Sequence, residues 1–313
     1  MVQIKEKCCV RENKKWPILV MVALLVCCLA TGMYSFLFIW QDDNTAPVIT
    51  INGEELQVSV SAPEEELLQG VSAADNRDGD VTSGIVVEGV SNIGDDHTAT
   101  VTYAAFDKSG NVAKAARTLI YTDYESPRFG LEEALVFRTG AAPDVLSLVT
   151  ATDAIDGDLS EQVKGVLVSD TGSLSYAGHH QVSFRVTNSM GDTAYITLPV
   201  DVYNAEENNA GVKLTDYLIY LEKGAQFQPK DYLSSLVIGA TAYPLKNLTR
   251  TESSGNELSI YECSYKSAAE EWKIYIKVEG AVDTSTPGTY SVAYTVTTNN
   301  YTGHTRLNVV VEE

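Results

Sequence analysis

Paired cysteines are absent from most of this 313-residue sequence. Four of its five cysteines lie within the first 40 residues, and only Cys263 lies in the long remainder. No intradomain disulfide can therefore stabilise the part of the chain that follows residue 40. Its domains must be held together by packed β-sheet cores, and we expect Cys263 to be a packed residue.

Motifs of the common enzyme classes are absent as well. The chain has no Gly-x-Ser-x-Gly elbow, no His-Glu-x-x-His pair and no phosphate-binding glycine loop. His179 and His180 are adjacent, so in a strand they would point to opposite faces and could not chelate one metal ion together. The many acidic pairs do not indicate a glycosidase, because linear spacing cannot show two carboxylates facing one bond. We therefore expect no enzyme activity.

Positive charge is scarce. The chain has 22 basic and 42 acidic side chains. Five of the basic and two of the acidic ones precede residue 41, which leaves a net charge of −23 on the rest. Such a surface repels nucleic acid and anionic membrane surfaces, so we expect no nucleic-acid partner. Either these acids form a solvated surface or some of them collect divalent cations.

One long apolar run is present, at residues 17–40, and it carries no charge. As a helix it would be roughly 36 Å long, enough to cross a hydrocarbon core of ~30 Å. Trp16 and Trp40 stand at its two ends, where a bilayer interface favours their rings. The basic side chains come before the run, and Asp42 and Asp43 follow it. The positive-inside rule then predicts residues 1–16 as a cytoplasmic tail and everything after residue 40 as extracellular.

A cleaved signal peptide is the competing interpretation of this run. Ala30 and Gly32 could form a cleavage site, but the apolar run continues through Trp40, whereas a signal h-region has only ~7–15 residues. A lipoprotein site is disfavoured because Val26 and Cys27, where a small residue is expected, precede the thiols of Cys27 and Cys28. We predict an uncleaved signal anchor that holds the protein in the lipid bilayer through residues 17–40.

From residue 44 onward the chain repeats itself. SAADNRDGDVT at 72–82 returns as TATDAIDGDLS at 150–160, and Asp75 and Asp153 are 78 residues apart. Tyr103 and Phe184 occupy matching places in later strands, and Tyr294 matches them in a third, more divergent copy. These matches predict three domains, at residues 44–123, 124–204 and 206–313.

Each copy is patterned as strands joined by turns. Apolar and small or polar residues alternate around Tyr103 and Tyr294, which is the period of a half-buried strand. Turns at 107–111, 188–192 and 299–303 each contain a glycine, which we expect to supply the positive φ of a hairpin. The predicted fold class is all-β: three tandem Ig-like β-sandwiches of about seven strands each after one transmembrane helix.

Several of these segments resemble a known family. NTAP at 44–47, AADNRDGD at 73–80 and YAAFDKSGN at 103–111 look like the bacterial immunoglobulin-like repeat that is labelled after a pesticidal crystal protein. The second copy matches less fully, since its turn exchanges the two end residues to Asn188 and Asp192, and the third keeps only the closing strands. The family occurs in tandem on surface proteins of Gram-positive bacteria, and the resemblance implies surface display or adhesion rather than a reaction.

The two Asp-Gly-Asp loops are the candidate metal sites. Oxygen-only clusters on a loop suit Ca²⁺, which takes ~6–8 oxygen ligands. An EF-hand is excluded because its first and twelfth positions would be Ala74 and Ile85. The alternative is a turn whose aspartates accept backbone hydrogen bonds. The candidate ligands are Asp75, Asp78 and Asp80 in the first domain and Asp153, Asp156 and Asp158 in the second.

The third domain is the candidate ligand-binding domain. It departs most from the repeat, with a long segment from Ala242 to Gly255 in place of the Asp-Gly-Asp loop, and it is rich in tyrosine. Tyrosine provides rigid amphipathic contact area at low entropic cost. Some of these tyrosines alternate with apolar residues and belong in the core. We predict that Tyr243, Tyr275 and Tyr301 contribute to a binding surface.

Together these features predict a single-pass membrane protein that displays three disulfide-free domains as a stalk or an adhesin. Its partner would be an extracellular protein or a glycan. The alternative function is that of an accessory subunit in a membrane export or cell-wall assembly complex, with the extracellular part docking a protein partner.

Overall fold

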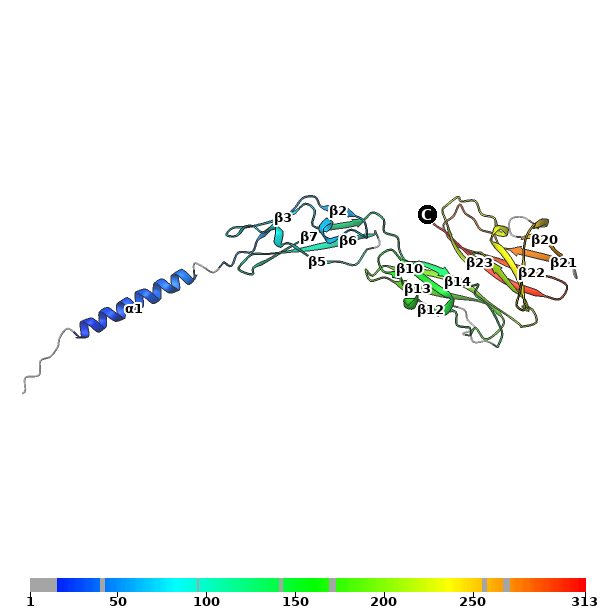
Figure 1. Cartoon of the computed structure of the whole chain (residues 1–313), viewed down its shortest axis with the longest axis horizontal. Coiled ribbons are helices and arrows are strands. Elements are labelled where there is room, and N and C mark those ends of the chain that lie inside the picture. Colours follow the sequence, from blue (N-terminus) through cyan, green and yellow to red (C-terminus); the bar gives the residue numbers. More distant parts are fainter. Residues whose placement is uncertain are drawn as a thin grey trace, which may run out of the picture. The chain divides into compact units, whose positions relative to one another are not determined.

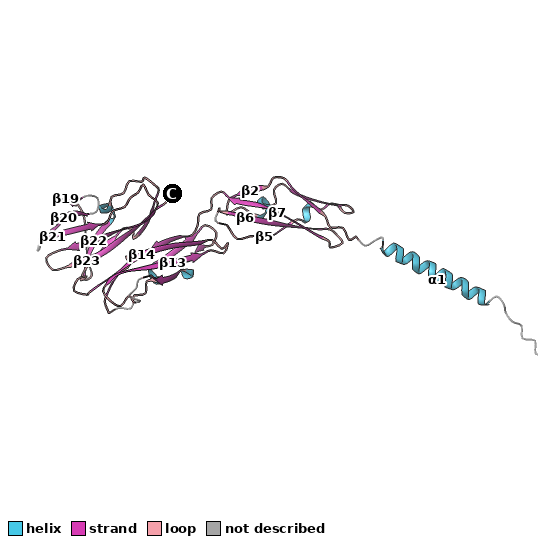
Figure 2. Ribbon diagram, turned by 180° about the vertical axis from the view of Figure 1, so that it is seen from behind, coloured by secondary structure: helices cyan, strands magenta, loops and turns pink. Residues whose placement is uncertain are grey.

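The computed structural model describes residues 16–39, 43–94, 96–140, 143–168, 173–254, 258–266 and 271–313. One apolar helix, α1 (Trp16–Ile39), precedes a series of β-sheets (Figure 1). Strands dominate everything after that helix, and the remaining helical segments are single turns (Figure 2). The predicted fold class, tandem Ig-like β-sandwiches after one N-terminal helix, is confirmed.

Helix α1 has 24 residues without a charged side chain. Pro17 lies in its first turn, where the missing N–H is not needed for the helical hydrogen-bond ladder. Every side chain from Trp16 to Phe36 is exposed, and the segment has a mean hydropathy of 2.3. One helix is thus long and apolar enough to cross a bilayer, although a signal sequence near an N-terminus has the same properties. The basic residues before it, Trp40 and Asp42 lie outside the described residues.

The first sandwich pairs a three-stranded sheet, in the order β1-β3-β4, with a four-stranded sheet, in the order β2-β7-β6-β5. Tyr103 on β6 is fully buried between them. Its hydroxyl donates to the Leu67 carbonyl oxygen at 2.7 Å and accepts from Arg117 Nε at 2.8 Å. The elements are β1 (Val48–Ile51), β2 (Glu55–Val58), α2 (Glu64–Leu67), β3 (Val71–Asp75), β4 (Gly79–Asp80), β5 (Val86–Val90), β6 (Thr98–Phe106) and β7 (Val112–Tyr121).

The second sandwich repeats this arrangement. Its sheets have the orders β11-β10-β8 and β12-β13-β14-β9, and β9 runs parallel to β14. Phe184 occupies the place of Tyr103 and is fully buried. The strands are β8 (Arg128–Leu131), β9 (Val136–Arg138), β10 (Val149–Asp153), β11 (Gly157–Asp158), β12 (Lys164–Leu167), β13 (Gly178–Thr187) and β14 (Thr193–Tyr203).

The third sandwich is larger, because the segment that diverges from the repeat forms additional strands. Its sheets have the orders β15-β17-β18 and β16-β23-β22-β21-β20-β19. Tyr294 is fully buried, and its hydroxyl donates to the Pro229 carbonyl oxygen at 2.9 Å. The strands are β15 (Gly211–Leu214), β16 (Leu218–Leu221), β17 (Leu233–Ile238), β18 (Thr241–Pro244), β19 (Thr249–Ser254), β20 (Leu258–Lys266), β21 (Glu271–Glu279), β22 (Gly288–Thr297) and β23 (Thr302–Val311).

The turn glycines follow the prediction in two sandwiches only. Gly110 and Gly191 have φ values of 89° and 81°. The prediction for Gly303 is wrong, because this residue lies within β23 and the turn closes earlier, where Thr298 N donates to Tyr301 O at 2.9 Å. A Cβ at Gly303 would meet the Ala210 carbonyl oxygen at 2.9 Å, so close packing explains the glycine there.

The described chain divides into two compact units. The first contains residues up to Leu56, 63–90 and 100–118, and the second contains residues 57–62, 91–99 and 119–313. The second and third sandwiches therefore belong to one unit.

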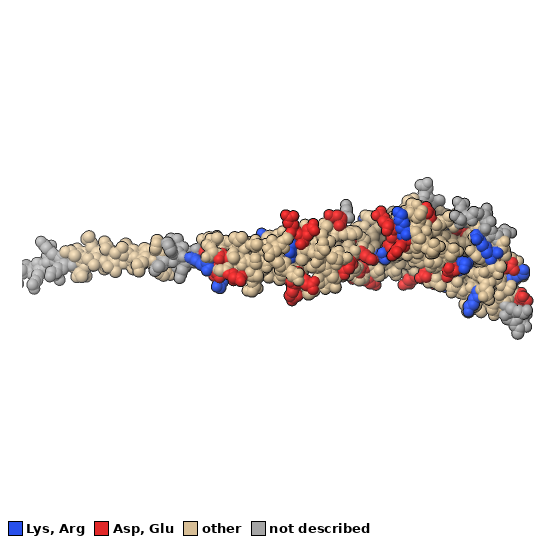
Figure 3. Space-filling model, turned by 90° about the horizontal axis from the view of Figure 1, so that it is seen from above, with Lys and Arg blue, Asp and Glu red and all other residues tan. Residues whose placement is uncertain are grey.

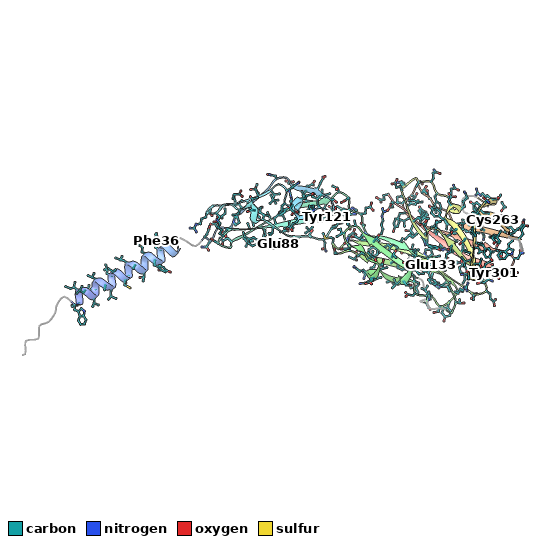
Figure 4. The ribbon with its side chains drawn as sticks, viewed as in Figure 1. Phe36, Glu88, Tyr121, Glu133, Cys263 and Tyr301 are labelled. Carbon is teal, nitrogen blue, oxygen red and sulfur yellow. The ribbon has the colours of Figure 1, made fainter. Side chains whose placement is uncertain are left out.

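Cys263 is buried and reduced in the core of the third sandwich, as predicted (Figure 4). The domain limits at 44–123, 124–204 and 206–313 stay a prediction.

Candidate metal centre

Asp75 ends strand β3 and is 7% exposed. Its Oδ1 accepts two backbone hydrogen bonds, from Arg77 N at 2.7 Å and from Asp78 N at 2.8 Å. These donors favour the charged carboxylate and hold the pKa of Asp75 below its usual value. Its Oδ2 is buried and finds no hydrogen-bond partner in the described part of the chain. The Oδ1 atom of Asp75 thus stabilises the turn, whereas its Oδ2 atom is buried without a hydrogen-bond partner among the described residues.

Two further carboxylates approach this free oxygen. Asp107 follows strand β6, and Asp43 precedes strand β1. One carboxylate oxygen from each of Asp43, Asp75 and Asp107 lies within 4.8 Å of one from each of the others. Asp75 and Asp107 are buried and Asp43 is half-buried. The Oδ2 atom of Asp43, like that of Asp75, is buried and has no hydrogen-bond partner among the described residues.

Asn111 holds this group together. Its backbone N–H donates to Asp107 Oδ1 at 2.8 Å. Its side-chain amide donates to Asp107 Oδ2 at 2.7 Å and to the backbone carbonyl oxygen of Asp43 at 2.9 Å. Burial raises the pKa of Asp107, but the hydrogen bonds from Asn111 outweigh it and the net pKa is lowered. Asp75 and Asp107 are therefore both ionised at neutral pH, side by side and largely out of water.

The other two predicted ligands of this loop lie elsewhere. Asp78 Oδ2 accepts from Lys108 N at 2.7 Å, and its Oδ1 is 3.3 Å from Lys108 Nζ. Asp80 is exposed, and its Oδ1 accepts from Thr82 N at 2.9 Å. The structure brings only Asp75 of the predicted trio into the carboxylate group. Sequence reasoning missed Asp43 and Asp107, although Asp107 belongs to the turn that the repeat comparison had singled out.

The second sandwich holds a counterpart of this group in which the buried carboxylate is hydrogen-bonded. Asp153 Oδ1 accepts from Ile155 N and Asp156 N, as Asp75 does from its own loop. Its Oδ2, however, accepts a hydrogen bond from Asn188 Nδ2 at 3.1 Å. Asn188 stands where the first sandwich has Asp107, so an amide donor replaces a carboxylate.

Tyr124 completes this second network. Its hydroxyl donates to Asp192 Oδ2 at 2.6 Å and accepts from Asn188 Nδ2 at 2.9 Å. Burial, followed by the bond to Asp192, raises the pKa of Tyr124 well above its usual value, so it remains a donor. Asp156 and Asp158, which are exposed, bond to Ser189 and Ser160 and stay outside this network. The predicted trio of the second loop is thus not brought together either.

The three predicted binding tyrosines differ in exposure. Tyr243 is half-buried and packs on Tyr265 and Trp272, with ring centroids 4.9 and 4.8 Å away. Tyr301, labelled in Figure 4, is half-buried against the core of the third sandwich. Tyr275 is 42% exposed on β21 and is the one large exposed apolar side chain of the third sandwich within the described ranges.

The second and third sandwiches meet in a polar junction. Asp201, which is 2% exposed, accepts from Arg306 Nε at 2.8 Å, and its other oxygen is 2.7 Å from His179 Nδ1. Tyr203 and His304 stack with ring centroids 4.0 Å apart. Burial lowers the pKa of His304, which keeps this imidazole neutral at neutral pH. A hollow of about 540 Å³ adjoins these groups, but its charged residues are bonded to one another.

Comparisons with known proteins give a partial match. No protein-family model matches the chain. The pesticidal crystal protein Cry22Aa of Bacillus thuringiensis is 29% identical over 148 residues, which are 47% of this chain and 16% of that protein. The chain therefore spans about a sixth of the length of this relative. The match supports an Ig-like repeat type.

Solved structures give further likenesses at low similarity. The protocadherin gammaB4 extracellular domain has 11% identity and a TM-score of 0.20, covering 87% of this chain and 52% of that one. Human CDH23 EC21-23 has 14% identity and a TM-score of 0.21, covering 85% and 100%. An endo-fucoidan hydrolase, MfFcnA4, has 14% identity and a TM-score of 0.16, covering 74% and 39%.

Proposed function

We propose that this chain is a non-enzymatic, membrane-anchored surface protein whose tandem sandwiches form an extracellular stalk. The observation that carries the proposal is the order of the parts along the chain: an apolar helix of 24 residues, whose side chains from Trp16 to Phe36 are all exposed, precedes disulfide-free Ig-like sandwiches. An exposed, apolar helix without charged side chains needs an apolar environment, and a bilayer provides one. Basic residues before the helix favour a cytoplasmic N-terminus.

The surface of the sandwiches suits an extracellular role. Acidic side chains are spread over the face visible in Figure 3, whereas the described part of α1 shows none. This negative surface disfavours nucleic acid and anionic lipid headgroups as partners of the extracellular part. The polar junction between the second and third sandwiches supports a stalk, because the buried bond between Arg306 and Asp201 resists bending there.

A topology experiment tests the anchor. Protease added to intact cells without a wall should degrade residues 41–313 and spare a tag at the N-terminus, because only the extracellular part is accessible. The same tag should be degraded once the membrane is opened with detergent. A mature chain that starts near Met33 and accumulates in the medium would contradict the proposal.

The third sandwich is the proposed partner-binding part, for an extracellular protein or a glycan, and Tyr275 is its exposed aromatic side chain. Tyr275→Ala should weaken binding of the full-length chain to cells or immobilised glycans. Tyr195→Ala is the matched control, since Tyr195 is 68% exposed on β14 of the second sandwich. Binding that survives Tyr275→Ala, or that is lost in Tyr195→Ala, would overturn this assignment.

Co-purification separates a free stalk from a complex subunit. A stalk or adhesin extracted in mild detergent should migrate without stoichiometric membrane partners. An accessory subunit of an export or cell-wall assembly complex should bring defined membrane proteins with it, and that outcome would overturn the proposal.

A further inference from the structure

We propose that the first sandwich binds one Ca²⁺ ion between the carboxylates of Asp43, Asp75 and Asp107. One oxygen from each lies within 4.8 Å of the others. Ca–O distances are about 2.3–2.6 Å, so two ligands on opposite sides of the ion are at most about 5 Å apart. The three oxygens therefore fit around a single Ca²⁺ ion.

Unpaired oxygens are the second observation that supports the site. Asp75 is more than nine-tenths buried, yet its Oδ2 has no hydrogen-bond partner among the described residues, and the same holds for Asp43 Oδ2. Buried carboxylate oxygens are normally hydrogen-bonded, because leaving a buried charge unpaired is costly. The other oxygen of Asp75 and that of Asp43 accept backbone hydrogen bonds, and both oxygens of Asp107 accept hydrogen bonds from Asn111. The unpaired oxygens thus belong to carboxylates that are already oriented.

The hydrogen bonds around the carboxylate group favour a bound cation. Backbone N–H groups donate to Asp75 and Asp107, and such donors stabilise a charged carboxylate. The ion pair described for this loop is made by Asp78 with Lys108, outside the carboxylate group. Like charges that are clustered and largely buried favour an external positive charge between them.

The donor set selects the type of cation. All three ligands are carboxylates, and hard cations prefer oxygen, whereas Zn²⁺ sites in proteins favour nitrogen and sulfur. Mg²⁺ demands close octahedral geometry at 2.0–2.1 Å and keeps several waters, while Ca²⁺ tolerates irregular ligand sets. We therefore expect Ca²⁺ to bind more tightly than Mg²⁺.

The position of Asp43 means that ion binding would affect the stiffness of the chain at the base of the first sandwich. Asp43 is three residues past Trp40, the last residue of the apolar run, while Asp75 and Asp107 belong to the sandwich itself. In the absence of the ion, the described hydrogen bond between Asn111 and the Asp43 backbone holds this segment. The bound ion would tie the start of the extracellular chain to two loops of the first sandwich, so that Ca²⁺ stiffens the base of the stalk.

The experiment is a calorimetric titration of the full-length chain in detergent with CaCl₂, after removal of metal with a chelator. One Ca²⁺ should bind per chain, and MgCl₂ should bind at least tenfold more weakly. Asp107→Asn and Asp43→Asn should each weaken Ca²⁺ binding tenfold or more. Asp80→Asn and Asp156→Asn are matched controls that carry the same chemical change in the Asp-Gly-Asp loops, and they should leave binding unchanged.

Two results would overturn the site. One is the absence of Ca²⁺ binding at millimolar concentration in the unmutated chain. The other is a loss of binding in Asp80→Asn with binding retained in Asp107→Asn, which would place the ion on the Asp-Gly-Asp loop. Melting curves in chelator establish that each variant folds. Asp43→Asn provides the answer if Asp107→Asn does not fold, because Asp43 precedes the first strand of the sandwich.

Discussion

The first and second sandwiches share a loop scaffold but differ in what it encloses. In both, the first aspartate of the loop accepts two backbone bonds, and the second reaches across to the β-hairpin turn. The first sandwich has Asp107 and Asn111 at the ends of that turn, and the second has Asn188 and Asp192. The two sandwiches therefore differ at the ends of this turn. The first has a cluster of three carboxylates, and in the second the corresponding groups are hydrogen-bonded to one another.

Tyr124 provides the hydrogen bonds that the second sandwich needs with Asn188 and Asp192 at the ends of its turn. Its hydroxyl lies between Asn188 and Asp192 and satisfies both side chains. The first sandwich has no tyrosine at the matching place, where the sequence reads Asn44, and the carboxylate of Asp43 joins the group there. A scaffold of this kind can thus satisfy its buried acid in two ways, with a cation or with an amide and a hydroxyl.

The largest expected effect comes from forcing the charged arrangement on the second sandwich. Asn188→Asp removes the donor to Asp153 and adds a buried negative charge beside it. We expect a loss of about 3 kcal/mol in the free energy of unfolding, measured by denaturant titration in chelator. The control, Asn76→Asp, makes the same change at an exposed loop position and should cost less than about 0.5 kcal/mol. An equal loss in both variants would contradict the comparison.

Calcium should act on the first sandwich alone. At a hundredfold excess over its Kd, a ligand that binds only the folded state should raise the melting temperature of a small domain on the order of 10 °C. Differential scanning calorimetry in CaCl₂ and in chelator measures this shift. Asp107→Asn should reduce this shift by about half or more, and Tyr124→Phe should leave it intact. If Tyr124→Phe removed the shift in melting temperature, the ion would bind to the second sandwich, and the account would be contradicted.

Removing the hydroxyl of Tyr124 should have a smaller effect. Tyr124→Phe leaves Asp192 and Asn188 each without one partner, and we expect a loss of about 1–2 kcal/mol in the free energy of unfolding. The pKa of Tyr124 is raised in the folded state, so its contribution is present below the unfolded pKa of about 10 and is lost as pH rises further. Stability above pH 10 should fall less steeply in Tyr124→Phe than in the unmutated chain. Identical slopes would contradict the assigned role.

Much of the scaffold could be predicted from the sequence. Alternation around Tyr103, Phe184 and Tyr294 located buried strands, because a period of two is a local property. The repeated Asp-Gly-Asp loops located Asp75 and Asp153, because a loop motif is also a local property of the sequence. Gly303 was misassigned because a glycine required by close packing has the same sequence signal as one required by a positive φ.

The carboxylate group could not be predicted in the same way. Asp43 and Asp107 each lie 32 residues from Asp75, so their convergence depends on how β1, β3 and β6 pack rather than on spacing within one loop. The exchange to Asn188 and Asp192 was visible in the sequence, but its meaning depends on where the Tyr124 hydroxyl lies. The tyrosines of the third domain show the same limit, since Tyr243 and Tyr301 pack against its core.

The smallest expected difference concerns Asp78 and Asp156, which make equivalent hydrogen bonds in the two sandwiches. Asp78 bonds to the backbone of Lys108, and Asp156 bonds to that of Ser189. Asp78→Asn and Asp156→Asn should each lower the melting temperature by a few degrees and by similar amounts, because each weakens one equivalent contact between loops. In calorimetry, a loss of the Ca²⁺ response in Asp78→Asn would contradict the structural role given to this residue.

Hydrogen exchange of the full-length chain, followed peptide by peptide with and without Ca²⁺, tests the contrast between the sandwiches most directly. If the ion binds at Asp43, Asp75 and Asp107, Ca²⁺ should slow exchange around residues 75–80 and 107–111. Exchange around 153–158 and 188–192 should stay the same, because hydrogen bonds already satisfy that network. Equal protection of both pairs of loops, or protection of neither, would contradict the account.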